Sequence, residues 1–252
     1  MAISRRALLR LTGAGALAGT LPALARGAAG SGGMRGLPWA YGALDPDATG
    51  DRAFDGYQRG HCMYGAFEAI AGQVAERLGP PFVSFPFEIF TYGGCGVNGW
   101  ATLCGALNGS AAAFQLLSAK PEPLIDALFS WYEREALPNY VPAAARFRNL
   151  PSRAGSPLCH ASIAAWCRGA GKRSYSPERQ ERCGVLTAAV ARQAVVLLNA
   201  QAAGKVLETG LSGTTAACMA CHEKGGALED IRSKMSCGGC HRVLAREHPT
   251  VP

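Results

Sequence analysis

Apolar residues recur three and four positions apart along much of the chain, which is the spacing of one face of an α-helix. Residues 61–78 show it most clearly, and Gly79-Pro80-Pro81 ends that segment. The alternation of polar and apolar residues that marks a half-buried strand is nowhere sustained. The sequence therefore predicts a mainly α fold, with further helices at residues 100–118, 123–136, 158–167 and 178–202.

Glycine and proline separate these helices. Residues 82–90 are aromatic and interrupted by proline, which predicts a connector, and a glycine-rich turn follows at residues 93–99. Residues 138–157 are rich in proline and arginine, so we expect a surface loop there. Gly105 and Gly109 lie four apart in one expected helix, and we expect them to let a second backbone approach closely.

The N-terminus has the pattern of an export signal. Arg5 and Arg6 belong to a positively charged stretch, an apolar run follows from Leu11 to Ala25, and Ala23-Leu24-Ala25 offers an A-x-A cleavage site. The paired arginines in S-R-R-x-L-L are typical of a twin-arginine signal. We expect residues 1–25 to direct export to the periplasm and to be removed there. A general secretory signal with two arginines, or an uncleaved anchor helix, is the alternative.

Two copies of a C-x-x-C-H motif lie near the C-terminus, at residues 218–222 and 237–241. This motif is the attachment signal of c-type haem. Its two thiols form thioethers with the vinyl groups of one porphyrin, and its histidine binds the iron. We expect two haems, attached covalently and ligated on one side by the residues that the motifs supply: Cys218, Cys221, Cys237 and Cys240, with His222 and His241 as axial ligands.

A zinc site is the alternative for these cysteines. Without the histidines they form C-x2-C-x15-C-x2-C, a spacing that also occurs in zinc ribbons with four thiolates. A zinc ribbon does not require a histidine directly after each cysteine pair. Haem c is attached on the exported side of the bacterial membrane, which agrees with the N-terminal signal. Both observations favour haem.

The remaining histidines are His61, His160 and His248. His248 lies seven residues after His241, so it is the candidate sixth ligand of one haem iron. A solvent-exposed histidine in the C-terminal tail is the alternative.

These features divide the chain into four parts. After the signal at residues 1–25, residues 26–60 are expected to form an extended lead-in, because aromatic residues are interleaved there with glycine and proline. Residues 61–209 are expected to form a helical domain that contains cysteines, and residues 210–252 a small, irregular domain that binds two haems. We expect no segment after residue 25 to be long and apolar enough to span a membrane.

The charge of the chain gives little reason to expect an acidic partner. The formal net charge is +7, and the loss of Arg5, Arg6 and Arg10 with the signal leaves +4. Two haems would add about four propionate carboxylates, which brings the protein near neutrality. We therefore expect no nucleic-acid binding and no stable membrane insertion after cleavage of the signal.

Six cysteines lie outside the haem motifs: Cys62, Cys95, Cys104, Cys159, Cys167 and Cys183. In an exported protein they could form three disulfides, for which 15 pairings exist. Four thiolates that packed helices bring together could instead hold a [2Fe-2S] cluster. The twin-arginine route carries folded proteins, generally ones that receive a cofactor in the cytoplasm, and this favours the cluster.

Residues 104–109 read C-G-A-x-x-G, with Cys62 upstream and Cys159 and Cys183 downstream. This pattern resembles a family of redox-active bacterial proteins defined by four cysteines and that motif. With two C-terminal haem motifs, the chain resembles the split-Soret cytochromes c. Three further segments carry that closer resemblance: Cys95-Gly96-Val97-Asn98-Gly99-Trp100, Leu158-Cys159-His160-Ala161-Ser162 and Ser176-Pro177-Glu178-Arg179.

The resemblance covers nearly all of the mature chain. It implies a homodimer whose haems stack at one end, with a haem-free helical domain that carries an iron-sulfur cluster. The favoured cluster ligands match the four cysteines of the family, and the two extra cysteines are alternates: Cys62, Cys104, Cys159 and Cys183, then Cys95 and Cys167.

Haem burial also indicates a dimer. Two porphyrins have four broad faces, and the segment from residue 214 onward has too few large apolar residues to cover them. The haems must pack on each other, on the helical domain or on another subunit. We expect an exported dihaem cytochrome that exchanges electrons with redox partner proteins and is a carrier rather than a catalyst. A haem enzyme that reduces a small substrate at an open axial site is the alternative.

Overall fold

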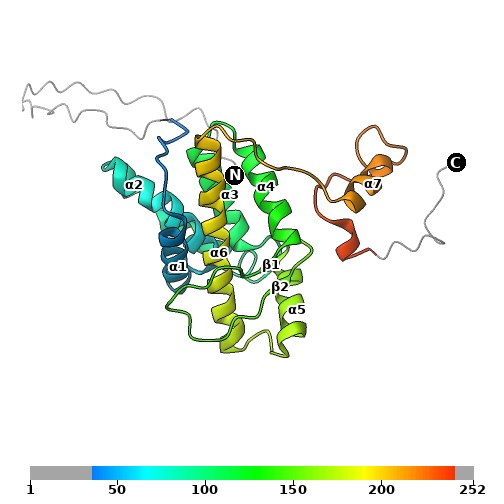
Figure 1. Cartoon of the computed structure of the whole chain (residues 1–252), viewed down its shortest axis with the longest axis horizontal. Coiled ribbons are helices and arrows are strands. Elements are labelled where there is room, and N and C mark those ends of the chain that lie inside the picture. Colours follow the sequence, from blue (N-terminus) through cyan, green and yellow to red (C-terminus); the bar gives the residue numbers. More distant parts are fainter. Residues whose placement is uncertain (1–35, 242–252) are drawn as a thin grey trace, which may run out of the picture. The chain divides into compact units, whose positions relative to one another are not determined.

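The computed structural model describes residues 36–241, so the signal at residues 1–25 and His248 lie outside the described part of the chain. The mainly α prediction is confirmed (Figure 1). The α-helices are α1 Pro46–Phe67, α2 Gln73–Leu78, α3 Gly105–Leu117, α4 Pro121–Arg134, α5 Cys159–Ala170, α6 Pro177–Ala202 and α7 Gly213–His222.

Short elements connect these helices. A π-helix, Glu68–Gly72, joins α1 to α2, and 3-10 turns occupy Phe82–Ser84, Phe87–Gly93 and Cys237–Gly239. β1 Ala136–Leu137, directly before the segment expected to be a loop, pairs antiparallel with β2 Ser152–Arg153 inside that segment. These two-residue strands are the only sheet in residues 36–241.

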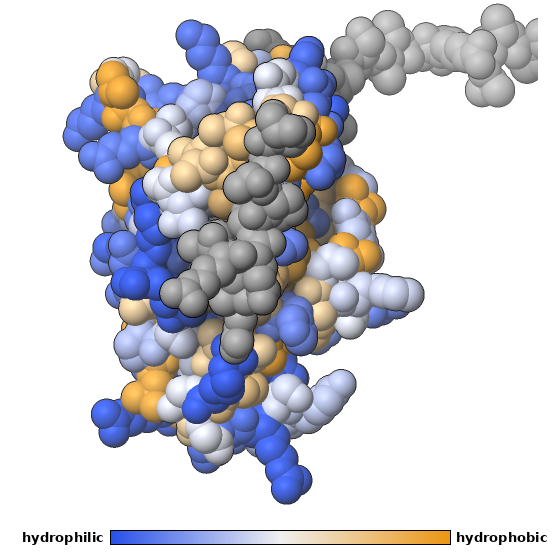
Figure 2. Space-filling model, turned by 90° about the vertical axis from the view of Figure 1, so that its right-hand side faces the viewer, coloured by the Kyte–Doolittle hydropathy of each residue, from blue (hydrophilic) through white to orange (hydrophobic). Residues whose placement is uncertain are grey.

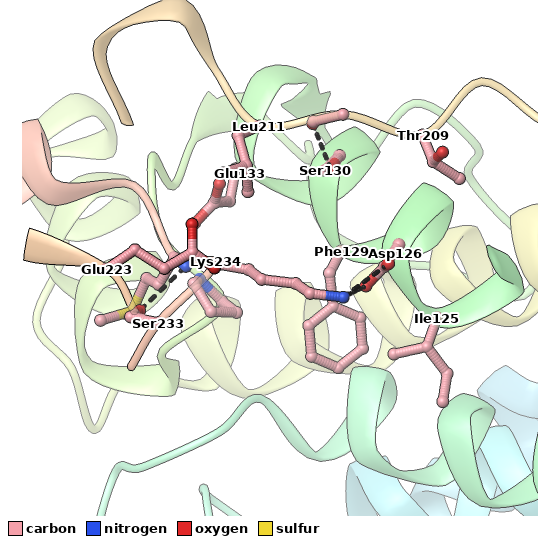
Figure 3. A pocket seen from close by; sticks show the side chains of 13 residues that line it. Ile125, Asp126, Phe129, Ser130, Glu133, Thr209, Leu211, Glu223, Ser233 and Lys234 are labelled. Atoms are coloured by element: carbon pink, nitrogen blue, oxygen red, sulfur yellow. Dashed lines mark hydrogen bonds and ion pairs between the residues drawn. The ribbon is translucent and has the colours of Figure 1, made fainter. Parts of the chain in front are cut away.

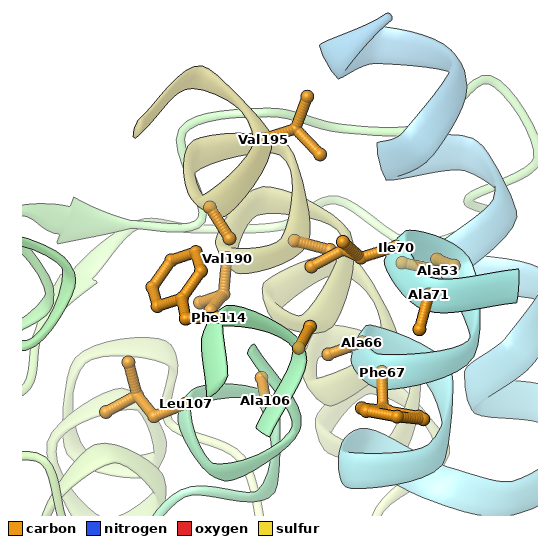
Figure 4. Packing of buried hydrophobic residues seen from close by; sticks show 14 of the residues in the cluster. Ala53, Ala66, Phe67, Ile70, Ala71, Ala106, Leu107, Phe114, Val190 and Val195 are labelled. Atoms are coloured by element: carbon orange, nitrogen blue, oxygen red, sulfur yellow. The ribbon is translucent and has the colours of Figure 1, made fainter. Parts of the chain in front are cut away.

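Helix α6 lies at the centre of the helical domain. Ser176 caps it by accepting a hydrogen bond from the backbone N of Arg179, and Pro177 occupies the first turn, where its missing N–H is not needed. Its Val190 and Val195 lie among core side chains of α1, α3 and the π-helix, including Phe114 and Ile70 (Figure 4). The apolar stripe predicted for residues 178–202 is therefore a buried core surface.

Helix α6 corrects the expectation that no segment after residue 25 is long and apolar enough to span a membrane. By length and composition it is apolar enough to cross a membrane, and it is the one such helix in the described residues. However, 67% of its most apolar window is buried inside the protein. Core helices of soluble proteins share this composition, because burial among other helices and burial in lipid select the same residues.

The extended lead-in expected at residues 26–60 is wrong from Pro46 onward, where α1 begins. Asp45 caps α1 by accepting a hydrogen bond from the backbone N of Ala48 at 2.8 Å, and Pro46 follows in the first turn. The helix is kinked at Gly60 and His61, which have non-helical dihedral angles. The helix predicted to start at His61 is thus the half of α1 beyond the kink.

The helix expected from residue 100 begins five residues later, at Gly105. Cys95, Val97, Asn98 and Ala101 have positive φ angles, a conformation in which an α-helix cannot continue. The glycine-rich turn at residues 93–99 therefore extends to about residue 101, and Trp100 in it is 79% exposed.

The C-terminal segment is more regular than expected because it contains α7. Ser212 caps this helix by accepting a hydrogen bond from the backbone N of Thr215 at 3.1 Å. In the face shown in Figure 2, hydrophilic and hydrophobic residues are interspersed. Large apolar side chains that remain exposed in this segment include Leu228 and Ile231.

Candidate haem and cysteine sites

The first C-x-x-C-H motif lies at the end of α7. Cys218 and Cys221 are three residues apart on the helix and His222 follows, so all three lie on adjoining parts of its surface. The Nδ1 atom of His222 is 2.7 Å from Oδ1 of Asp230. The hydrogen bond from His222 lowers the pKa of Asp230. A carboxylate at Nδ1 orients the ring so that Nε2 is the nitrogen suited to bind iron.

The second motif forms a tight turn. The backbone N of His241 donates to the carbonyl of Cys237 at 2.9 Å, which brings the two ends of the motif together. Burial raises the pKa of the Cys237 thiol, and the neighbouring Cys218 thiol raises it further. The motifs are thus adjacent in space although they begin 19 positions apart in the sequence.

One cavity of about 430 Å³ is lined by residues of both motifs and by three apolar side chains. Its lining includes Cys218, His222, Cys237, Cys240, His241, Met219, Ile231 and Met235. Paired thiols, an imidazole for each pair and an apolar wall are the donor set that covalent haem requires. His61 and His160 lie elsewhere, on α1 and α5.

The haem-motif segment is anchored to α4 by two polar contacts. Lys234 forms an ion pair with Asp126 at 2.7 Å, and the backbone N of Ser236 donates to Glu133 at 2.9 Å. These contacts border a second cavity of about 440 Å³, which Phe129 also lines (Figure 3). Burial raises the pKa of Glu133, although the hydrogen bond from Ser236 opposes this.

A third contact involves the loop that precedes α5. The buried hydroxyl of Ser156 donates to Sδ of Met235 at 3.4 Å, and the backbone N of Leu158 donates to the same hydroxyl at 3.2 Å. Cys159, the first residue of α5, follows directly.

The four favoured cysteines of the helical domain meet at one small cavity: Cys62 of α1, Cys104 before α3, Cys159 of α5 and Cys183 of α6. All four are buried, whereas the alternates differ, since Cys95 is exposed and Cys167 is half-buried. All ten cysteines lie in the described residues and none forms a disulfide. The structure therefore brings together the four residues that the sequence pattern selected.

Glycines beside the cysteines allow this convergence. A Cβ atom on Gly105 would lie 2.6 Å from the carbonyl oxygen of Gly93 and 2.9 Å from Cβ of Cys62. A Cβ atom on Gly109 would collide with the backbone carbonyl of Met63. The close approach expected from these two glycines is confirmed, and it places α3 against the backbone of α1 beside Cys62.

Burial controls the charge of these thiols. It raises the pKa of Cys62 well above its ordinary value and that of Cys159 to about 12, and in both cases neighbouring thiols add to the shift. Buried thiols of this kind stay protonated unless a cation compensates the thiolate charge. A metal centre would supply that compensation.

The four thiols at this cavity are the donor type and number that a [2Fe-2S] cluster takes. In residues 36–241, no three His, Cys, Asp or Glu side chains are arranged to hold one metal ion. A [2Fe-2S] cluster takes two protein thiolates on each iron, so its ligands form two pairs rather than one shell. The cavity also contains Arg182, whose buried Nε has no hydrogen-bond partner in the described structure.

Comparison with known proteins identifies the family. Residues 64–197 match the family described as "Putative redox-active protein (C_GCAxxG_C_C)". A split-Soret cytochrome c of Desulfovibrio desulfuricans is 36% identical over 219 residues, which cover 82% of this chain and 78% of that relative. The chain belongs to the split-Soret cytochrome c family.

A solved split-Soret cytochrome c from the same species, reported with a novel iron centre, matches with a TM-score of 0.76 and 34% sequence identity. The match covers 82% of this chain and 92% of that structure. Membership in the split-Soret family establishes this chain as a haem c-binding cytochrome of electron transfer, and the zinc alternative is set aside.

Three polar residues at these sites were not anticipated from the sequence: Asp230, Glu133 and Arg182. Asp230 contacts His222 across a turn and Glu133 accepts a hydrogen bond from Ser236 of a distant segment, so only the fold reveals these partners. Arg182 did leave a signal, since it is a charged residue directly before Cys183 at the start of the apolar part of α6.

Proposed function

We propose that this split-Soret cytochrome carries two haem groups per chain and transfers single electrons through them in the periplasm. The observation that carries the proposal is the single cavity lined by both C-x-x-C-H motifs. Cys218 and Cys221 would attach one haem and Cys237 and Cys240 the other, with His222 and His241 as axial ligands. Haem supplies the one-electron chemistry when it is bound.

The chain's own residues would tune these sites. Asp230 holds the ring of His222 through Nδ1, and such an outer carboxylate makes an imidazole a stronger donor to iron. Asp126 and Glu133 hold Lys234 and Ser236, and so fix the segment between the motifs against α4. His248 remains the candidate sixth ligand of one haem.

We also propose a [2Fe-2S] cluster held by Cys62, Cys104, Cys159 and Cys183. Their shared cavity, their burial and the absence of a disulfide among the ten cysteines support this assignment. The relative's reported iron centre supports it further. A cytoplasmically assembled cluster would account for the twin-arginine signal proposed at residues 1–25.

A homodimer is the proposed assembly. Leu228 and Ile231 of the haem-motif segment are 43% and 38% exposed. A segment with this much exposed apolar surface cannot cover two porphyrins alone, so a second copy would complete their burial. We propose that the mature protein has no stable membrane anchor after cleavage of the signal and that its partners are other redox proteins.

Metal and haem counts test these proposals. The protein should be purified from a host that exports it and attaches haem c, and then assayed for haem by pyridine haemochrome, for total iron and for molecular mass in solution. We expect two haems per chain, iron in excess of haem by about two atoms per chain, and a dimer. One haem per chain would contradict the dihaem assignment, and iron equal to haem would contradict the cluster.

A further inference from the structure

The inference concerns Arg182, whose side chain is the largest fully buried one in the described residues. Its Nη1 donates to Oγ of Ser162 at 3.0 Å and its Nη2 donates to Oγ of Ser152 at 3.4 Å. Its Nε has no acceptor. No ion pair in residues 36–241 includes Arg182. The guanidinium charge is thus buried with neutral partners only.

The nearest acid in the sequence does not compensate this charge. Glu181 is also buried, but its carboxylate accepts hydrogen bonds from the backbone N atoms of Arg146 and Phe147, and it pairs with the side chain of Arg146. An unpaired buried ion destabilises a protein by several kcal/mol. No carboxylate in residues 36–241 therefore compensates the charge of Arg182.

The four thiols line the same cavity as Arg182, together with Ser162 and Thr187. A second guanidinium is also near them, since Nη1 of Arg179 is 4.0 Å from Sγ of Cys183. Four thiolates around a [2Fe-2S] core carry net negative charge, and reduction by one electron adds one more. Arg182 would thus be unpaired without the cluster and paired with it.

We propose that Arg182 is a buried counter-charge of this cluster, with its unpaired Nε–H available as a hydrogen-bond donor toward it. This inference rests on the proposed iron-sulfur function. Arg182 would act on the cluster without ligating iron, so its role would be to retain the cluster and raise its reduction potential. Hydrogen bonds and net charge around the sulfur atoms are known determinants of that potential.

The effect of Arg182→Met should differ in direction between the protein without the cluster and the protein with it. This difference distinguishes the proposed role from ordinary packing. In the protein without cluster, Arg182→Met removes a buried charge and keeps a side chain of similar length, so stability should stay equal or rise. In the protein with cluster, the same change removes the counter-charge, so the cluster should be held less tightly. A purely structural arginine would destabilise both forms.

The experiment compares wild type, Arg182→Met, Arg182→Lys and Arg192→Met as full-length exported proteins with haem attached. Arg192 lies on the same helix but pairs with Asp47, away from the thiols, so it is the matched control. Three quantities are measured: the rate at which a chelator removes non-haem iron, the midpoint potential of the cluster, and the unfolding midpoint in denaturant before and after iron removal.

We expect Arg182→Met to lose iron at least about tenfold faster than wild type, the effect typical of removing a supporting residue around a metal. Its cluster potential should fall, and its iron-free form should unfold at the same denaturant concentration as iron-free wild type or higher. Arg182→Lys should retain iron better than Arg182→Met because it keeps the charge, and Arg192→Met should match wild type.

Two results would overturn the inference alone: iron loss and potential unchanged in Arg182→Met, or an equal loss of stability with and without iron. If Arg182→Met does not accumulate, Arg182→Lys carries the test, since an unchanged potential in that variant would also count against a hydrogen bond from Nε. Wild-type protein with no iron beyond its haem would overturn the cluster itself, and that outcome is recognised before any variant is compared.

Discussion

The cysteines of the helical domain and those of the haem-motif segment differ in how the fold makes each site. The four buried thiols come from four separate parts of the chain, from Cys62 to Cys183, and meet only where α1, α3, α5 and α6 pack. The haem cysteines are paired within two five-residue motifs and are half-buried or exposed. One site depends on tertiary packing, whereas the other depends on short segments that the folded domain only anchors.

The largest expected effect comes from removing one motif. Cys218→Ala with Cys221→Ala should remove one of the two proposed haems, because both of its thioether bonds are lost. The helical domain should keep its far-ultraviolet circular dichroism and its non-haem iron, because the motif is no part of that core.

Cys167→Ala is the control for this variant, since Cys167 is half-buried and lies in neither site. It should keep both haems. Loss of non-haem iron in the double variant would contradict the independence of the two sites.

The next largest effect is expected from disturbing the close backbone contact between α3 and α1 beside the four buried thiols. Gly109→Ala places a methyl group against the carbonyl of Met63, so α3 and α1 must separate. Overpacking of this kind destabilises by about 1–3 kcal/mol. Chemical denaturation should show this loss, and non-haem iron should fall while haem content stays constant.

Gly169→Ala is the matched control, because it is also a helical glycine but has open space around it. Replacing such a glycine should stabilise the protein by about 0.5–1 kcal/mol. Equal effects of the two substitutions would show that close backbone approach is not what Gly109 provides.

A smaller effect concerns the anchoring of the haem-motif segment. Asp126→Asn removes the ion pair with Lys234, and an exposed pair of this kind contributes at most about 1 kcal/mol. Limited proteolysis between α6 and α7 should become faster, and added salt should reduce the difference from wild type. Lys172→Met breaks a comparable ion pair with Glu178 near the start of α6 and should leave that cleavage rate unchanged.

The smallest expected effect is a dependence of folding stability on pH that arises from Glu133. Burial raises its folded-state pKa above the ordinary value of 4.5. The folded protein therefore holds this proton more tightly than the unfolded chain does. The resulting stability is fully present below pH 4.5 and is lost as pH rises through the raised pKa.

Glu133→Gln should remove this part of the pH dependence when urea unfolding midpoints are compared between pH 4 and pH 7, a range from just below the usual glutamate pKa to about 2.5 units above it. An unchanged slope in Glu133→Gln would place the titration on another group.

The sequence predicted those parts of the molecule that local patterns encode. Ser176 and Pro177 indicated the start of α6, and the apolar period indicated its buried face. The first half of α1 was missed, although Asp45 and Pro46 are a recognisable helix start, because glycines and aromatic residues obscured the period. Tertiary packing, rather than helix propensity, stabilises that segment.

At the two sites, too, local sequence patterns predicted some features and only tertiary packing determined others. Motif spacing selected every haem cysteine, and the C-G-A-x-x-G pattern selected the four buried thiols. Partners across long sequence distances could not be predicted: Glu133 reaches Ser236 over 103 residues, and Arg182 meets Ser152 over 30. Such pairs depend on how elements dock, which no single segment specifies.

The Ser156 hydroxyl has a consequence for how far apart the two sites can be. It contacts Met235 at the haem cavity and lies three residues before Cys159 at the thiol cavity. Three residues span at most about 11 Å between Cα atoms. The loop before α5 therefore limits the distance between the haem cavity and the thiol cavity, and inserting or deleting one residue in it would change that distance.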